Sequence, residues 1–363
     1  MKSGEKSIAV KKRFHEFITL QRGFDLPKTE MREGQYPVVG STSIIGYHDQ
    51  CKVQPPGVVM GRSGSLGIIQ FIKQPYWPHN TSLWVKDFKG NDPSFVYYRL
   101  QGFDFARFNA GAGVPTLNRN HLDGLEVEVP PLPVQCQIAS ILSAYDDLME
   151  NSQRRIRILD EMARALYRKW FVHFRFPGHE KIELVDSSLG KIPQGWEVKK
   201  LGEMLELNYG KALKHEDRRD GEFPVYGSSG IVGKHDTGFV KGPGIIVGRK
   251  GNVGSVFWCN QDFFVIDTAY FVTSSLPLRF LFYLLPRLNF INSDAAVPGL
   301  SRNQAYTLEI LIPPAALLKQ FCALADNFDG QESKLQRQIQ NLRRTRDLLL
   351  PRLLSGQVKV AER

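Results

Sequence analysis

The sequence predicts an α/β protein in which two globular units of mixed α/β structure are joined by two long antiparallel helices that form a coiled coil. Three observations lead to this prediction: an internal two-fold repeat, short apolar runs cut by glycine and proline within each copy, and a long apolar seam after each copy. A chain of 363 residues also exceeds the usual size of a single hydrophobic core, which favours two domains.

The internal repeat becomes visible when the second half of the chain is compared with the first. Residues 36–85 and 223–272 share 18 of 50 positions at a constant offset of 187. Residues 114–130 (VPTLNRNHLDGLEVEVP) and 297–313 (VPGLSRNQAYTLEILIP) share 8 of 17 positions at an offset of 183. The chain therefore contains two copies of one unit.

Each copy is expected to mix strands and helices. Short apolar runs such as PVV and LGIIQFI are separated by glycine and proline, which is typical of successive strands. The segments PSFVYYRLQGF and LRFLFYLLPRL have a helical pattern instead. A globule that combines both kinds of element belongs to the α/β class rather than to the pure barrels.

Two long helices are predicted after the copies, because apolar residues recur there in alternating steps of four and three. A helix of this length that is apolar along one side needs a partner. We expect the two helices to pack antiparallel on each other, the alternative being that each packs on its own globular unit. The seam positions are Ile138, Leu142, Tyr145, Met149, Ser152, Ile156, Leu159, Ala163, Leu166 and Trp170, then Phe321, Ala325, Phe328, Glu332, Leu335, Ile339, Leu342, Arg346, Leu349 and Leu353.

These features predict four domains along the chain. Residues 1–130 and 177–313 form the globular units, and residues 131–176 and 314–363 form the helical segments that follow them. The polar, turn-rich stretch from 176 to 203 is predicted to be a linker.

Composition narrows the class of protein and of partner. The formal charge of +10 and a pI near 9.3 favour a polyanionic partner, either nucleic acid or an anionic membrane surface. No run of about 18 apolar residues and no secretory signal is recognised, so we expect a cytoplasmic protein without membrane association. The four cysteines are isolated in the sequence, so neither a zinc site nor a disulfide framework is predicted.

The best candidates for contacts with DNA lie in two matching loops, GRSGSLG and GRKGNVG. Glycine lets the backbone approach a phosphate closely, and Arg62 and Arg249 can meet a phosphate or the acceptor edge of guanine. The alternative is a tight hairpin whose arginine is only solvated. The neighbouring positions differ between the copies, as two readers of different sequences would require: Ser63 and Ser65 in the first, Lys250 and Asn252 in the second.

A second polar cluster also recurs. Asparagine and arginine are the residue types that pair with adenine and guanine, although they are also common in turns and helix caps. His48 and His235 occupy matching places as well, and either contact DNA or stabilise a turn by hydrogen bonding. The cluster comprises Asn118, Arg119 and Asn120 in the first copy and Ser301, Arg302 and Asn303 in the second.

No catalytic or metal-binding constellation is recognised. Residues 227–235 (GSSGIVGKH) approach a phosphate-binding loop, but His235 stands where serine or threonine is required. Methyltransferase loops, nuclease carboxylate clusters and a GxSxG elbow are not found. We therefore expect no catalytic site, no metal and no cofactor. The alternatives are a DNA methyltransferase with unrecognised motifs and a non-catalytic DNA-binding scaffold.

Taken together, the residues resemble the specificity subunits of type I restriction-modification enzymes. The resemblance rests on GKIPQGWEVKKLGE before the second copy, the Gly-Arg loops, the repeated helices and LLLPRLLSGQV near the C-terminus, and it covers nearly the whole chain. The first copy departs from the pattern, since GEKSIA at residues 4–9 replaces the IPQGW-like lead.

The resemblance implies a working picture of the function. Each globular unit would be a target-recognition domain that reads one half of a bipartite, asymmetric sequence in double-stranded DNA. The helices would set the spacing and dock two methylation subunits, which would bind S-adenosylmethionine. The nuclease and translocase subunits would join through those partners, giving a restriction endonuclease and adenine-N6 methyltransferase complex.

Overall fold

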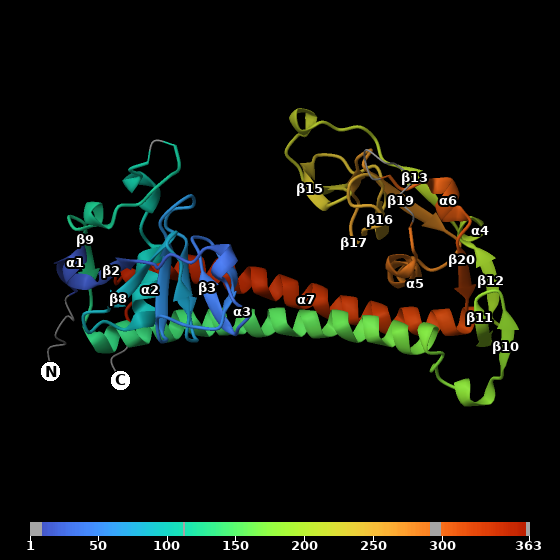
Figure 1. Cartoon of the computed structure of the whole chain (residues 1–363), viewed down its shortest axis with the longest axis horizontal. Coiled ribbons are helices and arrows are strands. Elements are labelled where there is room, and N and C mark those ends of the chain that lie inside the picture. The colour runs from blue at the N-terminus through green and yellow to red at the C-terminus, as the bar shows by residue number, and fades with distance from the viewer. Residues whose placement is uncertain (1–8, 112, 291–298, 361–363) are drawn as a thin grey trace. The chain divides into compact units, whose positions relative to one another are not determined.

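The computed structural model describes residues 9–111, 113–290 and 299–360. The chain divides into two compact units, of which the second contains residues 154–335. The first unit combines residues 1–153 with residues 336–363. The C-terminal segment of the chain therefore completes the unit that the N-terminal segment begins (Figure 1).

The described residues of the first unit form three sheets. The four-stranded sheet has the order β2-β8-β5-β6, the three-stranded sheet has the order β4-β3-β7, and β1 pairs with β9. The strands are β1 (Val10–Arg13), β2 (Thr19–Arg22), β3 (Tyr36–Val39), β4 (Ile44–His48), β5 (Gly57–Gly61), β6 (Ile69–Ile72), β7 (Trp77–Pro78), β8 (Ser82–Asp87) and β9 (Glu126–Val129). The short helices are α1 (Phe14–Phe17), η1 (Lys28–Glu30), α2 (Pro93–Gln101), η2 (Phe105–Phe108) and η3 (Arg119–Leu122).

The second unit repeats these three sheets strand for strand. Its sheets have the orders β13-β19-β16-β17 and β15-β14-β18, and β12 pairs with β20 as β1 pairs with β9. The strands are β12 (Glu197–Lys200), β13 (Leu205–Tyr209), β14 (Phe223–Gly227), β15 (Gly230–His235), β16 (Gly244–Gly248), β17 (Val256–Cys259), β18 (Phe264–Val265), β19 (Ala269–Ser274) and β20 (Glu309–Ile312). The helices are η5 (His179–Lys181), α4 (Leu201–Met204), η6 (His215–Asp217), α5 (Leu278–Leu284), η7 (Leu285–Arg287) and α6 (Arg302–Tyr306). The predicted internal repeat and mixed α/β class are confirmed.

An inner strand of each four-stranded sheet explains why the apolar runs of the sequence form strands. Every residue of β5 (GVVMG) and of β16 (GIIVG) is buried. A short, continuous apolar run of this kind suits a strand that is covered on both faces. The main core of the first unit is built around β5 and α2, and that of the second unit around β16 and α5.

The two predicted long helices are present. The first, α3 (Leu132–Tyr167), continues into a π-helical turn, η4 (Arg168–Val172), and the second, α7 (Ala315–Leu354), contains Gly330 and Pro351 within its length. Every predicted seam position is buried or half-buried. The alternation of three- and four-residue steps therefore identified the packed side of both helices.

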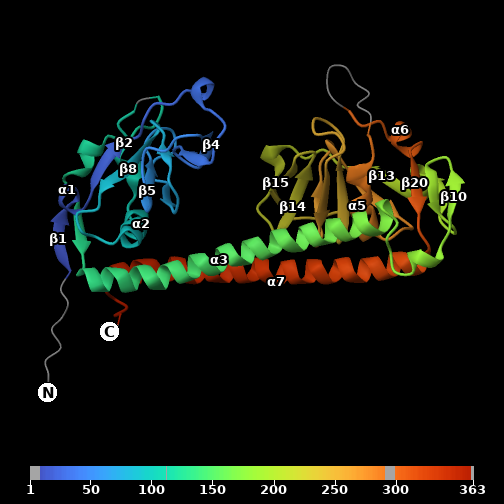
Figure 2. The ribbon, with the colours of Figure 1, turned by 60° about the horizontal axis from the view of Figure 1, so that its bottom comes forward.

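Within each unit the two helices run antiparallel, as Figure 2 shows. In the first unit the guanidinium of Arg346 lies 2.5 Å from the Asp146 carboxylate. In the second unit the ring of Phe321 lies 5.9 Å from the ring of Tyr167 and 6.2 Å from that of Trp170. The helices also pack on the globular cores, so both expected kinds of contact occur.

The predicted linker is wrong. Residues 176–203 contain β12 and the hairpin of β10 (Leu184–Ser187) and β11 (Gly190–Pro193). Phe176, Trp196 and Leu201 are buried in the core of the second unit, and Trp196 contacts Phe176 with ring centroids 5.4 Å apart. A few large apolar side chains thus anchor a segment whose average composition is polar.

Candidate nucleic-acid interface

The Gly-Arg loops follow the central buried strands β5 and β16. Gly64 and Gly67 have φ of 84° and 72°, and their counterparts Gly251 and Gly254 have φ of 80° and 74°. Only glycine adopts this left-handed conformation readily. A Cβ on Gly67 would also lie 2.7 Å from the Cβ of Phe105. The loops are therefore tight turns whose glycines are required by geometry.

In each unit the Gly-Arg loop is bonded to the second polar cluster. The carbonyl oxygen of Arg62 accepts a hydrogen bond of 2.8 Å from the backbone N–H of Leu117, next to Asn118. The carbonyl oxygen of Arg249 accepts an equivalent bond of 2.8 Å from Leu300. The structure thus joins two segments that lie far apart in the sequence, and it does so identically in both units.

The polar clusters also cap short helices. The Asn118 side chain accepts a 3.1 Å hydrogen bond from the backbone of Asn120 at the start of η3, and Ser301 caps α6 in the same way. The side chains of Arg119 and Arg302 donate to the carbonyl oxygens of Leu20 (3.0 Å) and Leu207 (3.4 Å). Capping accounts for the first residue of each cluster, and the arginines reach across to β2 and β13.

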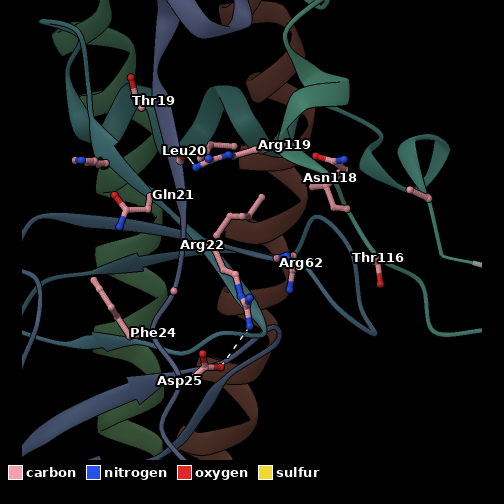
Figure 3. A pocket seen from close by; sticks show the side chains of 15 residues that line it. Thr19, Leu20, Gln21, Arg22, Phe24, Asp25, Arg62, Thr116, Asn118 and Arg119 are labelled. Atoms are coloured by element: carbon pink, nitrogen blue, oxygen red, sulfur yellow. Dashed lines mark hydrogen bonds and ion pairs between the residues drawn. The ribbon is translucent and has the colours of Figure 1, made fainter.

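A cavity of about 910 Å³ opens where the loop and the cluster of the first unit meet. Figure 3 shows Arg62, Arg119 and Asn118 around it, together with Arg22 from β2. Lys86 also lines the cavity, while Asp25 is the one carboxylate among its described lining residues and pairs with Arg22 at 3.3 Å. The cavity is therefore strongly basic and suited to an anionic ligand.

The second unit has a smaller cavity, of about 370 Å³, in the matching place. It is lined by Arg249, Lys250, Arg302 and Asn303 together with Tyr209 and Tyr270, and its described lining contains no carboxylate. The guanidinium groups of Arg249 and Arg302 lie 4.9 Å and 5.1 Å from the centre of the Tyr209 ring. Stacking of this kind holds an arginine in place while its charge stays available.

The lining differs at matched positions. At the offset of 187, Arg22 of the first unit corresponds to Tyr209 of the second, and Leu83 corresponds to Tyr270. Burial raises the pKa of Tyr270, and the neighbouring Tyr209 acts in the same direction, so its hydroxyl stays protonated. The two cavities share a frame and differ in the groups they present.

Four lining residues, Arg22, Lys86, Tyr209 and Tyr270, lie outside the repeated polar motifs of the sequence. These residues belong to β2, β8, β13 and β19, and only the sheet brings them beside the loops. One signal was available, because Arg22 and Tyr209 directly precede Gly23 and Gly210, which the repeat places in register.

The other predicted residues lie around the cavities rather than in them. Ser65 is exposed, and Asn120 lines a small adjoining cavity of about 230 Å³. The carbonyl of Ser63 accepts a 2.7 Å hydrogen bond from Ser41, and the side-chain amide of Asn252 donates to Ser229 at 3.1 Å. Ser63 and Asn252 therefore connect the Gly-Arg loop of each unit to a neighbouring hairpin.

His48 and His235 are buried and hydrogen-bonded. Their Nδ1 atoms each accept a 3.1 Å hydrogen bond, from the backbone N–H of Arg32 and of Arg219 respectively. The rings pack edge-on against Trp77 and Phe264. This environment favours the structural alternative, in which the histidines hold a turn, over direct contact with a ligand.

The described part of the chain shows no cluster of metal-ligating side chains and no membrane-spanning helix. Groups of three or more histidine, cysteine or acidic side chains able to hold a metal ion do not occur among the residues that the structure describes. In the same residues no helix combines the length and apolar character needed to cross a membrane. The four cysteines are free thiols.

Known proteins resemble this chain along most of its length. A family model described as the type I restriction modification DNA specificity domain matches residues 9–159 and, a second time, residues 193–342. The specificity subunit of the type I restriction enzyme MjaIX from Methanocaldococcus jannaschii is 24% identical over 354 residues, covering 86% of this chain and 80% of the relative. The EcoprrI specificity subunit from Escherichia coli is 25% identical over 130 residues, 36% of this chain and 32% of the relative.

A solved structure shows the same fold. The S subunit of a type I restriction-modification system from M. genitalium superimposes with a TM-score of 0.60 at 19% sequence identity. The match covers 97% of this chain and 98% of that one.

Proposed function

Because the chain belongs to the type I restriction-modification DNA specificity family, we propose that it is the non-catalytic DNA-recognition subunit of such a complex. Each target-recognition domain reads one half of a bipartite, asymmetric sequence in double-stranded DNA. We assign the domains to residues 1–130 and 177–313 and the helical spacers to residues 131–176 and 314–363. The proposal depends above all on the basic cavity that recurs in both units.

The chemistry of the cavities suits DNA. Arg62 and Arg119 in the first unit, and Arg249 and Arg302 in the second, offer planar donors that match phosphate oxygens or the acceptor edge of guanine. Tyrosine hydroxyls and asparagine amides supply further donors and acceptors. We place Ser63, Ser65, Asn118 and Asn120, and Lys250, Asn252 and Asn303, at the edges of the two contact surfaces. His48 and His235 act indirectly, by holding a turn.

The differences between the cavities support two targets rather than one target read twice. A shared backbone frame would place the DNA strands alike in both units, since phosphate contacts fix orientation without reading sequence. The side chains that differ, such as Arg22 against Tyr209, would then select different bases.

The helices have two roles in this proposal. As an antiparallel coiled coil, they set the gap between the half-sites, and they also dock two methylation subunits that carry S-adenosylmethionine. Exposed apolar side chains on α3 support the docking role, because exposed apolar surface marks interaction sites. They are Ile141 and Leu148 in the first unit and Ile158 and Met162 in the second. Nuclease and translocase subunits would join through the methylation subunits, and the complex would work in the cytoplasm.

Substitutions of Arg62 and Arg249 test whether the Gly-Arg loops read the bases of the DNA. If they contact base edges, Arg62→Ala lowers affinity by about 1–3 kcal/mol and relaxes the preference at one position of one half-site. Arg62→Lys retains the charge but loses two-pronged bonding, so it relaxes the preference nearly as much. The measurement is competition binding by the complex with its methylation partners, using DNAs altered in one half-site at a time.

Arg249→Ala and Arg249→Lys provide the matched control, because they should affect only the other half-site. If the arginines bind phosphates instead, affinity falls equally for all sequences and the salt dependence becomes shallower. Normal affinity and preference in every variant would remove the Gly-Arg loops from the interface.

A further inference from the structure

Two hairpins carry exposed apolar pairs at the same place in the repeat. In the hairpin of β3 and β4, Ile44 and Ile45 are 44% and 41% exposed. In the hairpin of β14 and β15, the corresponding Ile231 and Val232 are 63% and 36% exposed. Single exposed apolar side chains need no explanation. A pair of exposed apolar side chains that recurs at one register in both copies does need an explanation, because contact with water does not stabilise it.

The pairs lie on strands where apolar residues are a liability. β4 and β15 are the edge strands of the three-stranded sheets, and edges usually carry charge to prevent unwanted pairing. The register shifts at the same point in both hairpins, which leaves Ile45 and Val232 without a paired partner. Such bulges commonly redirect a side chain beside a binding site.

Each hairpin is bonded to the Gly-Arg loop of its unit. In the first unit the Ser41 hydroxyl, in the hairpin turn, donates to the carbonyl oxygens of Ser63 (2.7 Å) and Thr81 (2.8 Å). In the second unit the Ser255 hydroxyl donates to the carbonyl oxygen of Ser228 in the hairpin turn, at 2.6 Å. The hairpin turn that precedes each apolar pair is therefore held against the proposed DNA-contacting loop.

We propose that Ile44 and Ile231 contact thymine methyl groups at the edge of the half-site that each unit reads. This inference rests on the proposed function, because DNA must lie against the Gly-Arg loops. The thymine methyl is the apolar group that a duplex presents in its major groove, and apolar side chains recognise it. The hydrogen-bonded hairpin turn places the isoleucine near the Gly-Arg loop, whose polar groups would contact the DNA backbone and the polar edges of the bases. The side chains of Ile45 and Val232 exclude water from this contact.

The test replaces thymine by uracil, which removes the methyl group and nothing else. The complex with its methylation partners first selects its target from random duplex DNA, and each thymine of the selected site is then replaced singly. One uracil in the first half-site should weaken binding about fourfold, the effect of exposing one methyl-sized group. Ile44→Ser should abolish the response to that uracil and retain the response in the other half-site. Ile231→Ser should do the reverse.

Leu184→Ser is the matched control, because Leu184 is 52% exposed, between Ile44 and Ile231, and lies on β10 outside these hairpins. It should retain both uracil responses, and thermal melting should show that all three variants are folded. If no uracil weakens binding, or if the serine variants respond to uracil as the unaltered protein does, the methyl contact is refuted while bipartite selection leaves the proposed function standing. If the variants bind DNA normally but lose a methylation subunit, the pair is a protein-docking surface and the inference is wrong. Failure of the unaltered complex to select any bipartite sequence would overturn the proposed function itself.

Discussion

Replacing Phe321 by alanine is expected to destabilise the second unit by about 3–5 kcal/mol, the usual cost of removing a fully buried ring. Phe321 on α7 is fully buried. Its ring centroid lies 5.0 Å from that of Phe171 and 5.7 Å from that of Tyr283. The ring therefore joins both long helices to the core of the unit. Hydrogen exchange of the second unit's amides measures the loss without requiring two-state unfolding.

Leu324→Ala is the matched control for that experiment. Leu324 lies three residues further along α7 and is exposed, so its truncation should change stability by less than about 0.5 kcal/mol. If the two variants exchange at the same rate, α7 does not contribute to the core in the way its packing indicates.

Removing seven residues from each long helix should shorten the gap between the half-sites. Deletions within residues 149–162 and the matching 332–345 preserve the seam, because seven residues are one full period. Each helix loses roughly 10 Å at about 1.5 Å per residue. The preferred gap should shrink by about three base pairs, taking about 3.4 Å per pair. Binding to DNAs that differ only in gap length measures this shift, and DNA with the original gap should bind no better than random duplex.

A variant in which the same fourteen-residue windows keep their length but exchange the order of their heptads provides the control, since it should retain the original gap. An unchanged preference after the paired deletion would show that the helices do not set the spacing.

Much of the fold was predictable from the sequence because its signals are local or periodic. The repeat required only a constant offset, and the seam required only steps of three and four residues. The segment 176–203 departs from the predicted linker because four buried side chains, Phe176, Ile192, Trp196 and Leu201, anchor it in the core. The average composition of the segment is polar and hides them. Gly330 and Pro351 likewise lie inside α7, where tertiary packing outweighs their low helical propensity.

The candidate site was only partly predictable. Arg62 and Arg119 stood out because each lies in a repeated polar motif. Arg22 and Lys86 did not, because single basic residues on strands carry no signal until a sheet places them at one cavity. His48 and His235 show the reverse case. They recur in the repeat, but their recurrence reflects hydrogen bonds inside the fold. A residue that recurs in both copies can therefore be needed for the common fold as readily as for contact with a ligand.

The independence of the two readers is the central claim, and exchanging one of them tests it most directly. Residues 1–130 would be replaced by the corresponding domain of a relative with a different target, and the methylated adenines would be mapped in the genome of a host that carries the complex. If the two domains read DNA independently, one half of the bipartite methylated sequence should change, while the other half and the gap stay as they were. A change in both halves, or in neither, would contradict it.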